Sequence, residues 1–274
     1  MNSPVPAADR EAAVQREVTR IALSGARGFA LAGSGAIREH GVIERPTEDV
    51  DLFTTSQDPA AFGAAVDQVI ERLRGSGFAV EQVRRAAQYA RLHVGTSDGL
   101  QLDVDLGVDW RQDAPVFLEV GPVLSLADAV GNKVSALYSR AEARDYLDVD
   151  AIRASGRFSD DELLAAAAER DAGFDAAMFA DQLAAAGRLQ PAQVGRYGVT
   201  ADELEAVKTR CTHWAAGIRQ QAGNGPQGAV QGMPEHLRAS FPRPVISAAR
   251  QAPSSSPEAR PTRPASTPER GVER

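Results

Sequence analysis

The sequence predicts an α/β (α+β) protein with a mixed β-sheet, flanking helices and a helical C-terminal lobe. In the first half of the chain, short apolar segments with strand period alternate with amphipathic helical segments. An antiparallel run of strands, marked by the hairpin dipeptide Asp98-Gly99, follows this alternation. Beyond Ser155 the apolar residues recur mainly with helical period. We therefore expect an α/β domain at 11–122, a helical lobe at 123–221 and a third segment at 222–274.

The composition excludes several classes of protein. The 274 residues carry a formal net charge of −7, whereas nucleic-acid-binding proteins are more often basic, so any RNA contact has to come from a local basic patch. The single cysteine, Cys211, excludes an internal disulfide and fits a reducing compartment. No apolar run reaches the length of a membrane span, and no signal-peptide pattern opens the chain. We expect a cytoplasmic protein with no membrane partner.

The segments before the first acidic pair predict a helix, a strand and a second helix. Residues 11–24 carry apolar side chains at helical spacing. Residues 28–32 are small or apolar and predict a buried strand that runs into the turn Gly33-Ser34-Gly35. Residues 36–40 predict a short helix whose amino end faces that turn. Unpaired N–H groups and the helix dipole at such an end favour an anion.

The middle of the chain supplies the rest of the expected sheet. Asp58-Pro59 predicts the start of a helix with a buried apolar stripe. Residues 84–88 predict a turn between two strands, and Pro122 is expected to end the last strand. Including the first acidic pair, the strands after the glycine turn are expected at 49–53, 78–83, 89–94, 100–106 and 115–120.

The second half of the chain contains three sequences typical of helix N-caps, at Ser125, Ser159 and Thr200. A further amphipathic helix is expected at 175–187. Residues 222–274 differ, because they hold nine of the sixteen prolines and few large apolar side chains. Such a segment cannot bury enough apolar surface to offset its ordering entropy, so we expect a disordered tail rich in proline and arginine.

Two acidic pairs carry most of the chemical information. Asp49 and Asp51 lie two residues apart in a strand-like run, which places both carboxylates on one face. Asp103 and Asp105 share a face of another predicted strand in the same way. If the two strands are neighbours, three carboxylates can meet beside the turn at Gly33. Mg²⁺ prefers such oxygen ligands, and a glycine–serine turn can approach phosphate with backbone N–H groups, so the pattern predicts a metal and triphosphate site.

Four stretches resemble the motifs of AbiEii/MenT-type nucleotidyltransferase toxins, in the DNA-polymerase-β-like nucleotidyltransferase superfamily. They are Leu31-Ala32-Gly33-Ser34-Gly35-Ala36, His40-Gly41, Arg45 to Leu52, and Lys133 to Leu137 with Arg144-Asp145-Tyr146-Leu147-Asp148. The resemblance covers residues 28–152 well and the following helices loosely. It implies the nucleotidyltransferase fold, with a catalytic domain at 11–122 and a helical lobe at 123–221 that completes the active site.

The resemblance also assigns residues to the site. It implies that Asp49, Asp51 and Asp103 bind Mg²⁺ or Mn²⁺ and the triphosphate of an NTP substrate. Asp105 would replace Asp103 if the strand register differs by one pleat. Gly33 and Ser34 are expected to cradle phosphate oxygens.

The remaining candidates are basic residues and a later aspartate. Arg45 is expected either to contact phosphate or to pair with Glu48. Lys133 is expected to stabilise charge on the transferred phosphoryl group. The resemblance implies that Asp145 is catalytic or orients Lys133 or Arg140, whereas Asp148 was expected only to pair with Arg144 along the helix.

The function implied by the resemblance is transfer of NMP from NTP to an RNA acceptor, with the tRNA 3′ end as the expected target. In that case the protein is the toxin of a toxin–antitoxin pair and has a cognate antitoxin. Two alternatives stay open at this point. The acceptor could be a small molecule or a protein hydroxyl, or the chain could be a catalytically inactive NTP-binding module. Which NTP is used does not follow from the sequence.

Overall fold

The computed structural model describes residues 7–25 and 28–223, and the first half of this part is built on one mixed sheet. The predicted tail at 222–274 lies outside the described residues, except for its first two positions, which end the last helix. The strands are β1 (Ala30–Leu31), β2 (Asp49–Thr54), β3 (Ala79–Ala86), β4 (Tyr89–Gly95), β5 (Gln101–Val108), β6 (Val116–Leu118) and β7 (Gly121–Val123).

The sheet has the strand order β3-β4-β5-β2-β1-β7-β6 and combines parallel with antiparallel pairs. Strand β2 is parallel to β5 and antiparallel to β1, and β4 is antiparallel to β5. In the β2–β5 pair, Asp49 lies opposite Asp103 and Asp51 opposite Asp105. The mixed α/β class predicted from the sequence is therefore confirmed, and both acidic pairs lie on adjacent strands.

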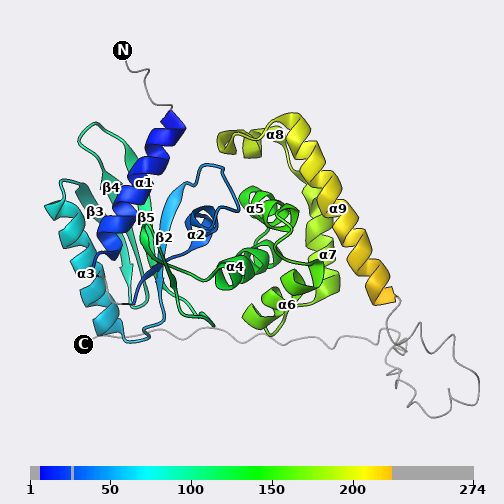
Figure 1. The fold of residues 1–274 in the computed structure, drawn as a ribbon, viewed down its shortest axis with the longest axis horizontal. Coiled ribbons are helices and arrows are strands. Elements are labelled where there is room, and N and C mark those ends of the chain that lie inside the picture. Colours follow the sequence, from blue (N-terminus) through cyan, green and yellow to red (C-terminus); the bar gives the residue numbers. More distant parts are fainter. Residues whose placement is uncertain (1–6, 26–27, 224–274) are drawn as a thin grey trace, which may run out of the picture. The chain divides into compact units, whose positions relative to one another are not determined.

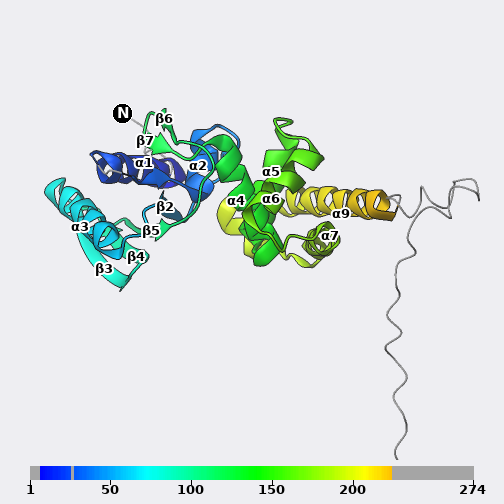
Figure 2. The ribbon, with the colours of Figure 1, turned by 90° about the horizontal axis from the view of Figure 1, so that it is seen from below.

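Helices α1 and α3 pack on the sheet, and a group of helices forms the second half of the described chain (Figures 1 and 2). The helices are α1 (Ala7–Leu23), α2 (Gly33–Glu39), α3 (Pro59–Gly75), α4 (Leu126–Ser139), α5 (Ala143–Ala154), α6 (Asp160–Arg170), α7 (Ala176–Ala184), α8 (Pro191–Val194) and α9 (Ala201–Gly223). Short 3₁₀ turns occupy Ala185–Arg188 and Gly195–Tyr197. Helix α4 contacts α2, α5, α6 and α7, and thus joins the two halves.

Local sequence explains where several helices begin. The Asp58 carboxylate accepts a hydrogen bond from the Ala60 N–H at 3.0 Å and caps α3. Ser125 accepts from the Asp128 N–H at 3.0 Å and caps α4. Ser159 forms a complete capping box with Glu162 at the start of α6. These predicted starts are confirmed, and each cap satisfies a backbone donor that the helix leaves without a partner.

Three details differ from the sequence prediction. Helix α2 begins at Gly33, so Gly33 and Ser34 form its first turn, not a turn before it. The expected turn at 84–88 is shorter, because Arg84 and Arg85 still pair within the β3–β4 hairpin. The expected strand at 115–120 is shortened to β6, and a further strand, β7, follows it and contains Pro122.

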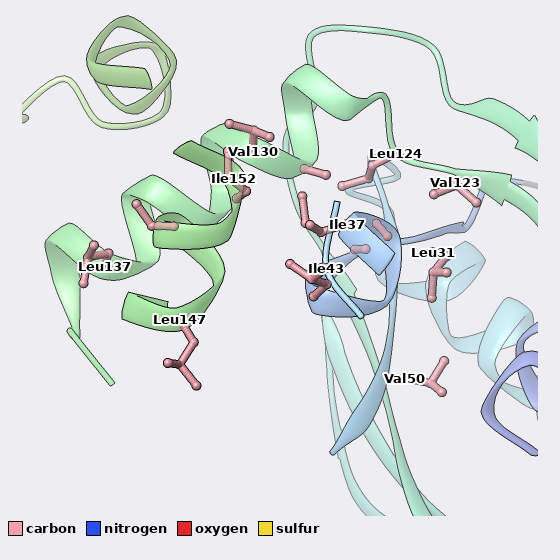
Figure 3. Packing of buried hydrophobic residues seen from close by; sticks show 14 of the residues in the cluster. Leu31, Ile37, Ile43, Val50, Val123, Leu124, Val130, Leu137, Leu147 and Ile152 are labelled. Carbon is pink, nitrogen blue, oxygen red and sulfur yellow. The ribbon is translucent and has the colours of Figure 1, made fainter. Parts of the chain in front are cut away.

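The buried apolar residues form one cluster that runs from the sheet into the helices. Figure 3 shows Leu31 and Val50 of the sheet and Ile37 of α2 on one side, with Val130 of α4 and Ile152 of α5 on the other. This shared packing joins α4 and α5, through α2, to the core of the sheet. The predicted boundary between a catalytic domain at 11–122 and a helical lobe at 123–221 stays a prediction.

In the part of the chain that the structure describes, no helix is long and apolar enough to cross a membrane.

Candidate active site

The acidic side chains of β2 and β5 converge on one point. Asp49, Asp51 and Asp105 each place a carboxylate oxygen within 4.8 Å of the others. The convergence follows from the strand pairing, because period two keeps Asp49 and Asp51 on one face and the parallel register sets Asp105 beside Asp51. Three oxygen donors at this spacing fit a hard divalent cation such as Mg²⁺, which takes carboxylate ligands and completes its shell with water or phosphate oxygens.

The third carboxylate of this cluster is Asp105, whereas the sequence favoured Asp103. Asp103 lies one pleat earlier on β5, opposite Asp49, and its carboxylate is hydrogen-bonded to the His93 ring. It is also 4.0 Å from the Arg91 guanidinium. The geometry thus groups Asp105, the alternative that the sequence left open, with Asp49 and Asp51, and it leaves Asp103 outside this cluster.

Strand β4 holds the Asp105 carboxylate in place. The Arg91 guanidinium donates two hydrogen bonds to it, from Nε to Oδ1 at 2.7 Å and from Nη2 to Oδ2 at 2.6 Å. The Tyr89 hydroxyl donates a third to Oδ1 at 2.8 Å. Arg91 and Tyr89 therefore orient the carboxylate and offset part of its charge, a role that sequence reasoning did not assign to either residue.

Burial and mutual repulsion change the acidity of the cluster. Burial raises the pKa of Asp51 to about 7, and the nearby charges of Asp49 and Asp105 add to the rise, while Lys133 opposes it. Burial also raises the pKa of Asp49, and the Arg144 guanidinium counteracts this. The carboxylates thus lack enough positive charge among their protein neighbours. A bound divalent cation would supply it, and the donor set fits one.

Gly33 is required by the close approach of α2 to Asp51. Its φ of +57° lies in the left-handed region that favours glycine. A Cβ atom at this position would lie 1.8 Å from the Asp51 Oδ2 atom and 2.8 Å from its Cγ atom. Only a residue without a side chain lets the start of α2 lie directly against the acidic cluster. The expected role of Gly33 in holding phosphate stays a prediction.

A buried charge network lies next to the acidic cluster and unites four distant segments. The Lys133 ammonium of α4 donates to the Ser34 hydroxyl at 2.7 Å and lies 2.9 Å from the Asp148 carboxylate of α5. Arg45 binds Asp148 through Nε and Nη2, both at 2.7 Å, and also donates to Ser34 at 2.9 Å. Burial raises the pKa of Asp148, but Lys133 and Arg45 outweigh it, so the pKa lies below its ordinary value.

The network differs from two expectations for the basic and acidic residues. Arg45 binds Asp148, whereas phosphate or Glu48 was expected as its partner. The residue that holds Lys133 is Asp148, whereas Asp145 pairs with Arg140 at 2.8 Å, the other partner that the sequence allowed. A helical pattern identifies only neighbours on the same helix, so it could not show that Asp148 faces Arg45.

Arg144 is not the partner of Asp148 that the helical spacing suggested. Its guanidinium lies 3.2 Å from Glu48 and 3.7 Å from the Asp49 carboxylate, which places a positive charge at the outer edge of the cluster. Arg144 thus belongs to the surroundings of the site, whereas its helical spacing indicated a pair with Asp148 on the same helix.

A cavity of about 350 Å³ adjoins the acidic cluster. It has the size of a small-ligand site. Its lining joins the start of α2, strand β2, the loop after β5, helix α4 and the end of α6. The residues are Gly33, Asp51, Phe53, Asp109, Trp110, Asn132, Lys133, Ser135, Ala136, Ser139, Arg140 and Arg170. One side is therefore acidic and suited to a metal ion, and the facing helix presents the lysine and arginine that an anionic ligand needs.

Comparison with known structures shows the fold. A protein from H. pylori described as a nucleotidyltransferase has a TM-score of 0.51 and 16% identity, over 77% of this chain and 95% of that one. The nucleotidyltransferase toxin MenT4 from Mycobacterium tuberculosis H37Rv, also 16% identical, has a TM-score of 0.46 over 82% of this chain and 92% of that one. The likeness to the H. pylori structure shows that the chain has a nucleotidyltransferase fold.

The family follows from the sequence match. The model of the family described as nucleotidyl transferase AbiEii toxin, type IV TA system, matches residues 20–230. The chain belongs to this family and is a nucleotidyltransferase of toxin–antitoxin systems. A search of curated protein sequences gave no match. The resemblance inferred from the four sequence motifs is confirmed.

Proposed function

We propose that the protein transfers NMP from an NTP to an RNA acceptor, the 3′ end of tRNA in particular, with Mg²⁺ or Mn²⁺ as the required cation. The observation that carries this proposal is the Asp49–Asp51–Asp105 cluster beside a cavity that also contains Gly33 and Lys133. A triphosphate and a divalent cation need an acidic and a basic wall facing each other, and this cavity supplies both. Membership of the toxin family supports a macromolecular target.

The carboxylates of Asp49, Asp51 and Asp105 would hold the cation. Bound there, Mg²⁺ supplies Lewis-acid stabilisation of charge on the phosphoryl oxygens and the acceptor oxygen. Arg91 and Tyr89 keep the Asp105 carboxylate in its orientation, through bonds of 2.6–2.8 Å. The Asp51 carboxylate lies against the α2 backbone at Gly33, and this contact limits its movement.

The basic side of the cavity would bind the triphosphate. Lys133 is buried except for its cavity face and is aimed by Ser34 and Asp148, so its ammonium can neutralise charge on phosphate oxygens without large rearrangement. Arg140 lines the same wall and is held by the buried Asp145 carboxylate. Arg45 acts on this site indirectly, since it holds Asp148 and Ser34. We therefore propose Arg45, Asp145 and Asp148 as positioning residues.

The reaction proposed is a displacement at the α-phosphorus. The acceptor hydroxyl oxygen forms a bond to phosphorus, the bond to the bridging oxygen breaks, pyrophosphate leaves, and the hydroxyl proton passes to solvent. Addition of a nucleotide to the tRNA 3′ end would prevent aminoacylation of that end. A toxin acting in this way would stop translation until its cognate antitoxin relieves the effect.

The test is a transfer assay with the full-length protein, each of the four α-labelled NTPs and total tRNA. We expect label in tRNA with Mg²⁺ or Mn²⁺, none with a chelator, and none with Asp51→Asn. Asp103→Asn is the matched control, since it removes a carboxylate from the same sheet face outside the cluster. Parallel assays offer aminoglycosides and protein hydroxyls as acceptors. No label in any RNA with all four NTPs would refute the RNA acceptor, and label in a parallel assay would identify the acceptor instead.

A further inference from the structure

An exposed tryptophan lies at the cavity on the loop that follows β5. The large hydrophobic side chains that are exposed in the described residues are Val83, Trp110, Val116, Phe117 and Met178. Of these, Trp110 is the one that lines the cavity with Asp51 and Lys133, and 53% of its surface is exposed. An aromatic ring held open to water beside a ligand cavity is typical of a binding surface.

The loop holds the ring in a fixed position. The Asp109 N–H donates to the Thr54 carbonyl at 2.9 Å, and the Trp110 N–H donates to the Asp109 carboxylate at 2.8 Å. Arg170 of α6 donates to the Trp110 carbonyl at 2.8 Å, and its guanidinium carbon lies 4.8 Å from the centre of the indole ring. Because the backbone on both sides is tied to other elements, a ligand that stacks on the ring has little ordering to impose.

Arg170 is itself anchored in the interior. Its guanidinium pairs with the buried carboxylate of Asp128. The same carboxylate accepts hydrogen bonds from the backbone N–H groups of Gln112 at 2.9 Å and Asp113 at 3.0 Å. Asp128 therefore fixes both the arginine under the ring and the end of the loop that carries it. This arrangement keeps Trp110 at the cavity and away from the core.

We propose that Trp110 is the stacking platform for the nucleobase of the donor NTP. This inference rests on the proposed use of NTP at the Asp49–Asp51–Asp105 site. Gly33, Asp51 and Lys133 occupy the part of the cavity suited to phosphate and metal, and Trp110 offers the aromatic surface in the same cavity. Stacking on an aromatic ring is tolerant of base identity because every base has a π-face. Trp110 thus contributes affinity for all four NTPs and leaves base choice to other groups.

The test uses the intrinsic fluorescence of the full-length protein, which contains two tryptophans. Trp214 is buried, packs edge-on against Phe179 and does not line the cavity, so it serves as an internal background. We expect each Mg²⁺–NTP to quench tryptophan fluorescence in a saturable way. Mg²⁺–tripolyphosphate should reverse the quench by competition and cause none itself, because it has no base. Trp110→Phe should abolish the quench while thermal shifts still report NTP binding.

Trp110→Ala measures the contribution of the ring. We expect the Kd of all four NTPs to rise by about 5- to 150-fold, the loss of one stacked base, with the Kd of tripolyphosphate unchanged. Phe117→Ala, which removes another exposed ring on β6, is the matched control and should leave every Kd unchanged.

Several results would overturn the inference. An equal loss of tripolyphosphate affinity in Trp110→Ala would show a structural effect on the phosphate side. An unchanged NTP Kd with a raised KM for RNA would place the ring at the acceptor. Absence of any NTP binding by the parent protein would remove the basis of the inference. The readouts of NTP and tripolyphosphate binding need no acceptor, so failure of tRNA transfer alone would refute the proposed acceptor and leave the binding test of Trp110 intact.

Discussion

Replacement of Gly33 by alanine tests the contact between helix α2 and the acidic cluster. The new Cβ atom would lie 1.8 Å from the Asp51 Oδ2 atom, whereas ordinary contacts begin at 3.4 Å. The two groups must therefore separate by about 1.6 Å, the difference between these values. A displacement of about 1 Å of a catalytic group can cost about 100-fold in rate, so we expect kcat/KM for transfer to fall by about 100-fold or more.

The same change also strains the backbone, and this effect can be measured separately. An alanine in the left-handed region costs about 1–2 kcal/mol, which lowers Tm by about 2–8 °C in a chain of this size. Gly41→Ala is the matched control, because Gly41 has a φ of +67° and no atom within 4 Å of the added Cβ. It should show the same loss of Tm with no loss of activity.

Melting curves and initial rates of NMP transfer, measured on both variants, separate misplacement of Asp51 from general loss of stability. Activity of Gly33→Ala within about threefold of the parent would refute the view that the α2 start positions Asp51. An equal loss of activity in both variants would attribute the effect to general destabilisation.

Three further predictions concern single carboxylates. Because the folded-state pKa of Asp51 is raised to about 7, its contribution to stability falls as pH rises from about 4 through 7. Without metal, the Asp51→Asn variant should thus be more stable than the parent at pH 8, by about 1–2 kcal/mol after allowance for the solvent access of the side chain. Near pH 4 the two proteins should be equally stable. Thermal melts at both pH values check this, and a variant that is less stable than the parent at pH 8 would contradict it. Asp105→Asn should lower the transfer rate by about 100-fold and Asp103→Asn by less than about threefold, and the reverse order in a rate comparison would restore Asp103 as the ligand. Asp148→Ala leaves two buried cations without their carboxylate, so urea unfolding should show a loss of about 3–5 kcal/mol, and a loss below about 1 kcal/mol would argue against a buried network.

Local patterns in the sequence were enough to predict the strand that carries the acidic pair. Alternation of Val50 and Leu52 with the two aspartates is a property of neighbouring residues, and both apolar side chains are fully or almost fully buried. The helix caps at Asp58 and Ser159 were predictable for the same reason, since each motif spans only a few residues.

Pairings between distant segments could not be read from such patterns. The choice between Asp103 and Asp105 depends on how β2 and β5, about fifty residues apart in the sequence, are aligned. A shift of two residues leaves every side chain on the same face of the sheet, so the apolar pattern cannot distinguish the two alignments. The partner of Asp148 lies 103 residues earlier, at Arg45, so helical spacing pointed to a neighbour on α5 instead. The Trp110 loop carries no motif at all, and its position depends on Arg170 and Asp128.

The Lys133–Asp148–Arg45 network also depends on the order in which the chain is synthesised. A nascent chain of 122 residues already contains Asp49, Asp51 and Asp105, but it has neither the ammonium group of α4 nor the buried counter-charge of α5. The buried charge network that holds Lys133 therefore cannot form until helices α4 and α5 have emerged from the ribosome.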